Sequence, residues 1–333
     1  MNQKEKKSSV LGIGNALVDV INVLKNDNVL TKFELPRGSM TLVDAALSRK
    51  IYDATKFSKR ELFTGGSAAN TIHTLASLGG SCGYLGKIGE DELGNTFKGE
   101  FERKKIQTHL FISEKDTGRV MSLVSPDSER TMATYLGAAA DLKPEELSSE
   151  IFSNYSILYI EGYLVQDHNL IETAIDLARA KGLKIAIDLS SFNIVEENLE
   201  FLQELIAKKV DIVFANEEEA QAFTGSTDPR EALLKLAEIT ELAVVKIGKG
   251  GSLISHKGDT VIIKIDPVES IDSTGAGDLY AAGFLFGYIQ NQPMKVCGEL
   301  GSLLAGSVIQ GIGAKIPEEK WEDILRKARR IMD

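Results

Sequence analysis

The sequence predicts an α/β fold in which helices cover both faces of a mostly parallel sheet, with a small β lid added to this three-layer core. Three observations support this prediction. Short apolar runs of strand length alternate with amphipathic segments along most of the 333 residues. Two other regions alternate apolar with polar residues, as half-buried strands do. A composition of 43% hydrophobic and 26% charged residues suits one folded unit, so we expect a single domain over residues 1–333.

The expected core strands are short apolar runs bounded by polar residues or glycine. They comprise Val10–Gly14, Ile157–Glu161, Lys184–Leu189, Ile212–Ala215 and Ala243–Ile247. Between them, Leu170–Lys181 and Arg230–Thr240 carry apolar residues at helical spacing. Strands that alternate with helices run parallel and are joined by right-handed crossovers. The ligand crevice is therefore expected at the carboxyl ends of the strands.

The lid strands are expected approximately within residues 23–44 and 110–136, where apolar and polar residues alternate between turn signals. We expect these strands to be antiparallel and to pair with one another. At the end of the chain, Pro317–Met332 predicts a charged amphipathic helix that packs through Trp321 and Ile324.

The charge balance excludes several classes of partner. With 38 Lys and Arg against 48 Asp and Glu, the formal net charge is −10, which disfavours nucleic acid and anionic membranes. No apolar run approaches the ~18 residues of a membrane span, and no secretory signal is evident. The two cysteines suit a reducing compartment. We expect a cytoplasmic protein that acts on a small molecule.

The most informative segment is D-S-T-G-A-G-D at residues 272–278, directly before a strongly apolar helix. Gly275 and Gly277 allow a ligand to approach the backbone closely. The N–H groups of Ala276, Gly277 and Asp278 are expected to be unpaired donors at the helix N-terminus, where an anion binds readily. Asp278 could accept a proton from a substrate hydroxyl. The alternative is that Asp278 only caps the helix, but a cap requires neither both acids nor both glycines.

Three common motifs of other enzyme classes are absent from the sequence. The first strand leads into a G-x-G, but Leu17 replaces the third glycine of the dinucleotide-binding fingerprint. There is no P-loop motif and no H-E-x-x-H zinc motif.

The string D-S-T-G-A-G-D-x-x-x-x-G-F resembles the C-terminal signature of the ribokinase-like (PfkB) carbohydrate and nucleoside kinases. The family's N-terminal signature is matched by G-G-S-A-A-N at residues 65–70 and by G-Y-L-G-K-I-G-E-D-E-L-G at residues 83–94. Order and spacing agree from about residue 10 to residue 317. The resemblance implies a ribokinase-like core with a β lid and ATP-dependent transfer of phosphate to an alcohol.

By the same resemblance, Asp278 would be the catalytic base. Gly275, Ala276 and Gly277 would form the anion hole for the transferring γ-phosphoryl group, and such positioning supplies most of the rate in phosphoryl transfer.

Asn216 and Glu219 resemble the N-x-x-E motif that organises Mg²⁺ and phosphates, with Glu219 acting through water. Without the resemblance, the same residues predict a helix cap and an acidic first turn. Asp272 and Thr274 resemble a monovalent-cation site of some family members, which leaves K⁺ as an optional further cofactor.

The resemblance also locates the ATP site. Gly248 and Gly251 belong to the glycine-rich loop that admits the phosphates and ribose. Ser302 and Ala305 lie on the helix that flanks the adenine.

The acceptor would bind at the N-terminal end of the chain. Asp19 and Asn70 correspond to the family's ligands of sugar hydroxyls, Asn15 adds a polar contact, and Gly66 packs close to the ribose. The N-x-x-x-D spacing from Asn15 to Asp19 resembles adenosine-kinase-like members.

Two acceptor classes remain open. Met132, Tyr135 and Leu136 could form an apolar wall for a base, which favours a nucleoside such as adenosine. Arg130 could instead meet a carboxylated or phosphorylated sugar, which keeps ribose, fructose or a keto-deoxy sugar acid as the alternative. A non-catalytic binding protein with the kinase fold is the alternative of another class. Monomer and lid-mediated homodimer are both open.

Overall fold

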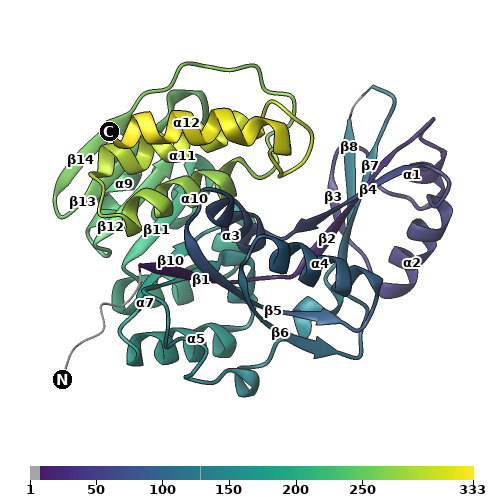
Figure 1. Cartoon of the computed structure of the whole chain (residues 1–333), viewed down its shortest axis with the longest axis horizontal. Coiled ribbons are helices and arrows are strands. Elements are labelled where there is room, and N and C mark those ends of the chain that lie inside the picture. The colour runs from purple at the N-terminus through teal and green to yellow at the C-terminus, as the bar shows by residue number, and fades with distance from the viewer. Residues whose placement is uncertain (1–7, 128) are drawn as a thin grey trace.

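The computed structural model describes residues 8–127 and 129–333, which form a nine-stranded sheet and a five-stranded sheet (Figure 1). The larger sheet has the strand order β14-β13-β12-β11-β10-β9-β1-β5-β6. Its neighbouring strands are parallel except β12–β13 and β13–β14. The strands are β1 Ser9–Ile13, β5 Ser81–Gly89, β6 Gln107–Ser113, β9 Ile157–Glu161, β10 Lys184–Asp188, β11 Ile212–Asn216, β12 Leu242–Lys246, β13 Ser252–His256 and β14 Asp259–Ile263.

The central strands are apolar along their whole length because both faces of the sheet are covered. Strands β1 and β9, for example, are buried at every residue. All five expected core strands lie within about one residue of their predicted bounds. The predicted α/β fold is confirmed.

One face of the large sheet packs against α3 Ser67–Ser77, α4 Glu92–Arg103, α10 Ala276–Ile289 and α11 Met294–Val308. The other face packs against α5 His168–Ala180, α6 Phe192–Glu197, α7 Leu199–Lys209, α8 Glu217–Thr224 and α9 Pro229–Ala237. The C-terminal helix α12, Trp321–Met332, packs on α10 and α11 through Trp321 and Ile324, as its pattern predicts. Short 3₁₀ helices are η1 Gly137–Asp141, η2 Pro144–Glu146, η3 Gly162–Gln166, η4 Gly248–Gly250 and η5 Glu318–Lys320.

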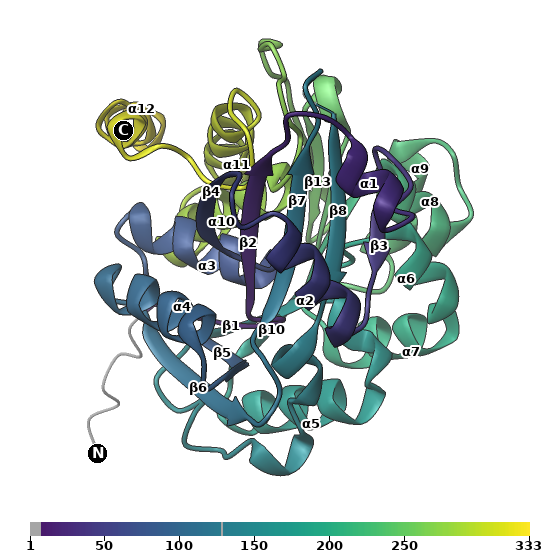
Figure 2. The same cartoon turned by 90° about the vertical axis from the view of Figure 1, so that its right-hand side faces the viewer.

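The smaller sheet, called the lid here, has the order β3-β8-β7-β2-β4 and stands to one side of the core (Figures 1 and 2). Helices α1 Asn28–Lys32 and α2 Ala45–Ala54 lie on its outer side, where α2 packs against β7 and β8 (Figure 2). The lid strands are β2 Leu17–Val23, β3 Met40–Leu42, β4 Lys59–Gly65, β7 Gly118–Val124 and β8 Arg130–Tyr135.

The lid differs from the expectation in its strands and in their direction. Residues 23–44 contribute only β3 and the end of β2, and they also form the helix α1. Strand β6 belongs to the large sheet, where it is an edge strand. Pairs β2–β7 and β3–β8 are parallel, so the lid is mixed rather than antiparallel. Alternation identifies a strand with one covered face, but it does not identify the sheet that the strand joins.

No helix in the described part of the chain is both long and apolar enough to cross a membrane.

Candidate active site

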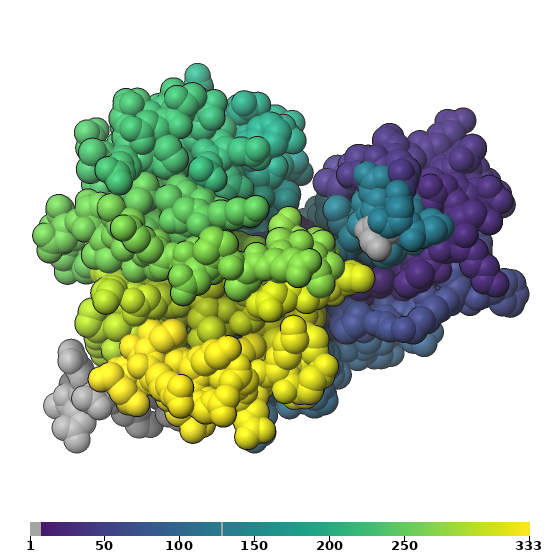
Figure 3. Space-filling view, turned by 90° about the horizontal axis from the view of Figure 1, so that it is seen from above, coloured from purple at the N-terminus to yellow at the C-terminus, as the bar shows by residue number. Residues whose placement is uncertain are grey.

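A cleft of about 1550 Å³ lies between the lid and the carboxyl ends of the core strands. In the space-filling view, a hollow separates the purple and teal lid from the green and yellow remainder (Figure 3). The residues predicted to bind or act on substrates line this one cleft, except Asp272 and Tyr135. The structure therefore brings together residues from both ends of the sequence.

The N-terminus of α10 opens into the middle of the cleft. Gly275 precedes the helix with φ 77°, a left-handed conformation that favours glycine, and a Cβ there would meet the Cβ of Ala314 at 2.5 Å. The expectation of three unpaired amides was wrong for Ala276, whose N–H donates to the carbonyl of Ser273 at 3.1 Å because the chain forms a tight turn before the helix. The N–H groups of Gly277 and Asp278 belong to the first helical turn, where no intrahelical acceptor exists.

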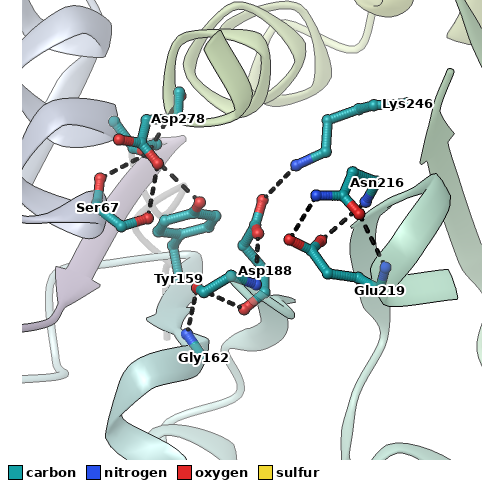
Figure 4. Close-up of polar contacts among 10 residues, drawn as sticks. Ser67, Tyr159, Gly162, Asp188, Asn216, Glu219, Lys246 and Asp278 are labelled. Carbon is teal, nitrogen blue, oxygen red and sulfur yellow. Dashed lines mark hydrogen bonds and ion pairs between the residues drawn. The ribbon is translucent and has the colours of Figure 1, made fainter. Parts of the chain in front are cut away.

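The carboxylate of Asp278 projects from this turn toward α3. It accepts hydrogen bonds from Ser67 Oγ at 2.7 Å and from Asn70 Nδ2 at 2.9 Å (Figure 4). Burial raises its pKa to about 6, against the two hydrogen bonds, which lower it, while the negative charge of Asp188 adds to the increase. Oδ1 of Asn70 is buried and has no hydrogen-bond partner within residues 8–127 and 129–333.

Glu161, at the end of β9, organises the side of the cleft next to Asn70. Its carboxylate accepts hydrogen bonds from Asn15 Nδ2 at 2.7 Å and from the N–H of Ala68 at 2.9 Å. Burial raises its pKa to about 7, although these hydrogen bonds oppose the increase. Sequence reasoning missed Glu161 as a site residue. The available signal was a carboxylate at the carboxyl end of an entirely apolar strand.

Asp19 lies on β2 in the lid and completes this end of the cleft. Burial raises the pKa of its carboxyl group, while the charges of Arg130 and Lys315 lower it. The close approach of the chain here requires glycine. A Cβ at Gly65 would lie 2.8 Å from the carboxylate of Asp19, and Gly66 has φ 97°.

Three neighbouring strands end in polar side chains on the other side of Asp278. They are Asp188 on β10, Asn216 on β11 and Lys246 on β12 (Figure 4). Lys246 Nζ lies 2.9 Å from Asp188 Oδ2, and both side chains are largely buried. Sequence reasoning missed Asp188, which belongs to no recognisable motif. Lys246 directly precedes the glycine-rich loop, but the sequence assigned it no contact with phosphate.

Asn216 and Glu219 form the helix cap that was the alternative explanation for them. Asn216 Oδ1 accepts from the N–H of Glu219, and the carboxylate of Glu219 accepts from the N–H and Nδ2 of Asn216, all at 2.8 Å. Glu219 nevertheless lines the cleft. Burial raises its pKa to about 7, with Lys246 lowering it and Asp188 raising it.

The far end of the cleft is formed by the loop after β12 and by α11. Gly248 and Gly251 both have positive φ, and a Cβ at Gly251 would collide with the carbonyl oxygen of Ile263. Ser302 and Ala305 line the cleft from α11.

Asp272 and Thr274 form a hydrogen-bonded group with Arg130 and Gly313. Asp272 Oδ2 accepts from Arg130 Nη1 at 2.9 Å and from the N–H of Gly313 at 2.8 Å. Its Oδ1 accepts from the N–H and Oγ1 of Thr274, and Arg130 also donates to this hydroxyl at 3.2 Å. A guanidinium thus holds the two side chains that were expected to bind K⁺. Among the described residues, no cluster of three or more His, Cys, Asp or Glu side chains could hold a metal ion.

Comparisons with known proteins identify the family of this chain. Residues 39–321 match the pfkB family carbohydrate kinase. The 5-dehydro-2-deoxygluconokinase of Geobacillus kaustophilus is 27% identical over 281 residues, covering 79% of this chain and 83% of that protein.

Two solved structures resemble the whole chain. The adenosine kinase of Sinorhizobium meliloti is 36% identical with a TM-score of 0.85, and a probable sugar kinase of Rhizobium etli is 33% identical with a TM-score of 0.86. Each match covers 97% of this chain and 99% of the other. The chain belongs to the pfkB family of carbohydrate kinases and is a phosphotransferase that acts on a hydroxyl group of a sugar or nucleoside.

Proposed function

We propose that this kinase transfers the γ-phosphoryl group of ATP to a primary hydroxyl of a ribose-bearing nucleoside, with adenosine as the first candidate. The observation that supports it most is the position of Asp278. Its carboxylate lies at the first turn of α10, between the hydroxyl-binding residues on α3 and the polar strand ends. Because both sheets supply residues to this one cleft, we propose that residues 1–333 act as a single kinase domain.

Asp278 acts as the general base in this proposal. The acceptor oxygen forms a bond to the γ-phosphorus while the bond from that phosphorus to the bridging oxygen of ADP breaks, and the hydroxyl proton passes to Asp278. The backbone at Gly275, Ala276 and Gly277 surrounds the transferring group. The free N–H groups of the first turn stabilise the negative charge there.

Asn15, Asp19 and Asn70 bind the ribose hydroxyls. Gly66 lets the chain pass close to Asn15 beside the sugar, because a Cβ there would collide with the carbonyl oxygen of Asn15. The buried Oδ1 of Asn70 supports this assignment. An unpaired buried acceptor costs about 1–3 kcal/mol, which a hydroxyl of the substrate would offset.

The lid supports a nucleoside over an anionic sugar. Its inner side presents apolar residues to the cleft, including Val120, Met132 and Leu136, while Met40 and Leu42 are 51% and 60% exposed. A base would cover this apolar surface. Arg130, the residue that could have recognised an acidic sugar, is already paired with Asp272 at 2.9 Å. The 36% identity to an adenosine kinase also supports the proposal.

ATP would lie along the far half of the cleft, with its phosphates at Gly248 and Gly251 and its adenine near Ser302 and Ala305. The donor chemistry of this half fits Mg²⁺, because Glu219 lines the cleft and supplies carboxylate oxygens, the ligands that Mg²⁺ prefers. Glu219 would hold the ion through water. When bound, Mg²⁺ would offset the charge of the phosphates.

The test is an acceptor panel assayed by ADP release with Mg-ATP. Adenosine, other nucleosides, ribose, fructose and 5-dehydro-2-deoxygluconate are compared at equal concentrations. We expect the largest kcat/KM for a nucleoside. Faster turnover of any free sugar or sugar acid than of every nucleoside would overturn the acceptor assignment and leave the kinase class unaffected.

A further inference from the structure

The carboxyl ends of β10, β11 and β12 bring one ammonium group to the turn where the phosphoryl group is proposed to transfer. Strand β11 lies between β10 and β12. Asn216 and Lys246 are register partners on β11 and β12, and Asp188 ends β10 (Figure 4). Asp188 is paired with Phe214, two residues before Asn216, and the carboxyl ends of the three parallel strands lie at the same edge of the sheet.

The ammonium of Lys246 lies beside the N-terminus of α10. A Cβ at Gly277 would be 3.1 Å from Lys246 Nζ, so the cation lies next to the first turn of α10, where Gly277 lines the cleft. An ammonium group has three N–H donors. Asp188 Oδ2 accepts one of them at 2.9 Å. Among the described residues, no other side chain or carbonyl accepts a hydrogen bond from this ammonium. Donors thus remain for the oxygens of a ligand.

The other described cations that line the cleft are placed differently. Arg130 is paired with Asp272. Lys249 is exposed, and Lys327 pairs with Asp323 on the surface helix α12 with 55% of its side chain exposed. The side chain of Lys246, in contrast, is only 14% exposed. In such a setting a charge acts more strongly than in water, because less solvent screens it.

Lys246 faces three carboxylates, those of Asp188, Glu219 and Asp278, and all three contribute to its electrostatic environment. Neutralising Asp188 would by itself be a purely structural role for Lys246. The position beside Gly277 is not explained by that role, because an ion pair with Asp188 does not require the ammonium to lie next to the first turn of α10.

We propose that Lys246 is a catalytic residue whose ammonium contacts the transferring phosphoryl group, and that Asp188 is a positioning residue that holds this ammonium beside Gly277. The inference deepens the proposed function on the ATP side and does not depend on the identity of the acceptor. As the bond between the γ-phosphorus and the bridging oxygen breaks, negative charge grows on the phosphoryl oxygens and on ADP, and Lys246 stabilises it. Lys246 exchanges no proton, because Asp278 takes the proton of the hydroxyl.

The decisive comparison is between K246M and the double variant K246M/D188N. Methionine keeps the length of the side chain and removes the charge, and we expect kcat to fall at least about 10²-fold with the acceptor KM within about threefold. The double variant removes both charges, so it restores the charge balance and guards against misfolding from an unpaired Asp188. If Lys246 only neutralises Asp188, the double variant recovers wild-type turnover and the proposal is wrong. If Lys246 is catalytic, turnover stays low.

A binding measurement gives an independent readout. The probe is ADP with Mg²⁺ and aluminium fluoride, a mimic of the transferring phosphoryl group, and the signal is the shift in Tm relative to ADP with Mg²⁺ alone. We expect wild type and the control K208M, at an exposed position of α7, to show the additional shift. We expect both Lys246 variants to lose it while keeping the shift caused by ADP. An unchanged additional shift in K246M would contradict the proposal.

Turnover is measured with whichever acceptor of the panel is fastest for the wild-type protein. Should every nucleoside fail and a sugar succeed, the acceptor assignment falls and the test of Lys246 proceeds with that sugar.

Discussion

The two acids of the D-S-T-G-A-G-D segment, Asp272 and Asp278, lie in opposite electrostatic surroundings. Burial alone would raise the pKa of Asp272, but hydrogen bonds from Thr274 and Gly313 and the charge of Arg130 outweigh it, and the pKa is lowered. Burial raises the pKa of Asp278 to about 6, because its partners are neutral donors and Asp188 lies nearby. One acid therefore remains an anion, while the other titrates close to the pH of the cell.

The groups that surround each carboxylate, and not the residue type, therefore decide what an acid in this segment can do. A carboxylate saturated by a guanidinium and backbone N–H groups holds a loop in place. A carboxylate with a raised pKa and access to the cleft can accept and release a proton.

Asp278 and Asp272 should differ most in their effect on turnover. We expect D278N to lower kcat by about 10²- to 10⁴-fold, since the variant has no general base. Steady-state ADP release measures the change, and D176N, at an exposed position of α5, serves as the control. Retention of near-normal kcat by D278N would remove the proposed role of Asp278.

The second difference is expected in stability. We expect D272N to lower the free energy of unfolding by about 3 kcal/mol, because Arg130 would be left largely buried without a charged partner. Urea unfolding followed by circular dichroism measures it. The double variant D272N/R130M should recover most of the loss. A D272N protein as stable as wild type would mean that the ion pair contributes nothing to the fold.

The third difference is in stability as a function of pH, which the two carboxylates should affect in opposite directions. Because the pKa of Asp278 is raised above its ordinary value of 3.8, its favourable contribution exists below about pH 4 and is lost as the pH rises through about 6. D278N should therefore be more stable than wild type at pH 7.5, by about 2 kcal/mol, with no gain at pH 4.

For Asp272 the sign reverses. Its lowered pKa contributes stability above its ordinary value of 3.8, and this contribution is lost as the pH falls through the lower folded value. The deficit of D272N should be complete at pH 7.5 and shrink in acid. Unfolding free energies at several pH values test both statements, and equal pH dependence of the two variants would contradict them.

The smallest difference concerns Ser67, which donates to Asp278 Oδ1 at 2.7 Å. Removing this donor in S67A weakens the charged form, so the pKa of Asp278 should rise above about 6. We expect the acid limb of the profile of kcat/KM against pH to move upward by less than about one unit. Ser77, on the same helix, bonds only a helix carbonyl, and S77A should leave the limb unchanged. A profile that S67A does not move would show that this hydrogen bond does not tune the base.

Much of the core could be predicted from the sequence because its strands are buried on both faces and read as unbroken apolar runs. The glycine-rich turn at Gly275 could be predicted for a related reason, since a left-handed residue before a helix requires glycine. A β lid could be predicted, but its set of strands could not, because β2 is buried nearly throughout and β6 overlaps the expected lid region although it joins the large sheet.

Local pattern alone determined that this protein has an α/β core and a glycine-rich helix start, because both depend on residues close in the chain. Only the tertiary structure decided which partners the charged residues have. Arg130 meets Asp272, Asn15 meets Glu161 and Lys246 meets Asp188, each across a long stretch of sequence. Coulomb energies and desolvation depend on distance in space and on burial, neither of which a linear pattern specifies.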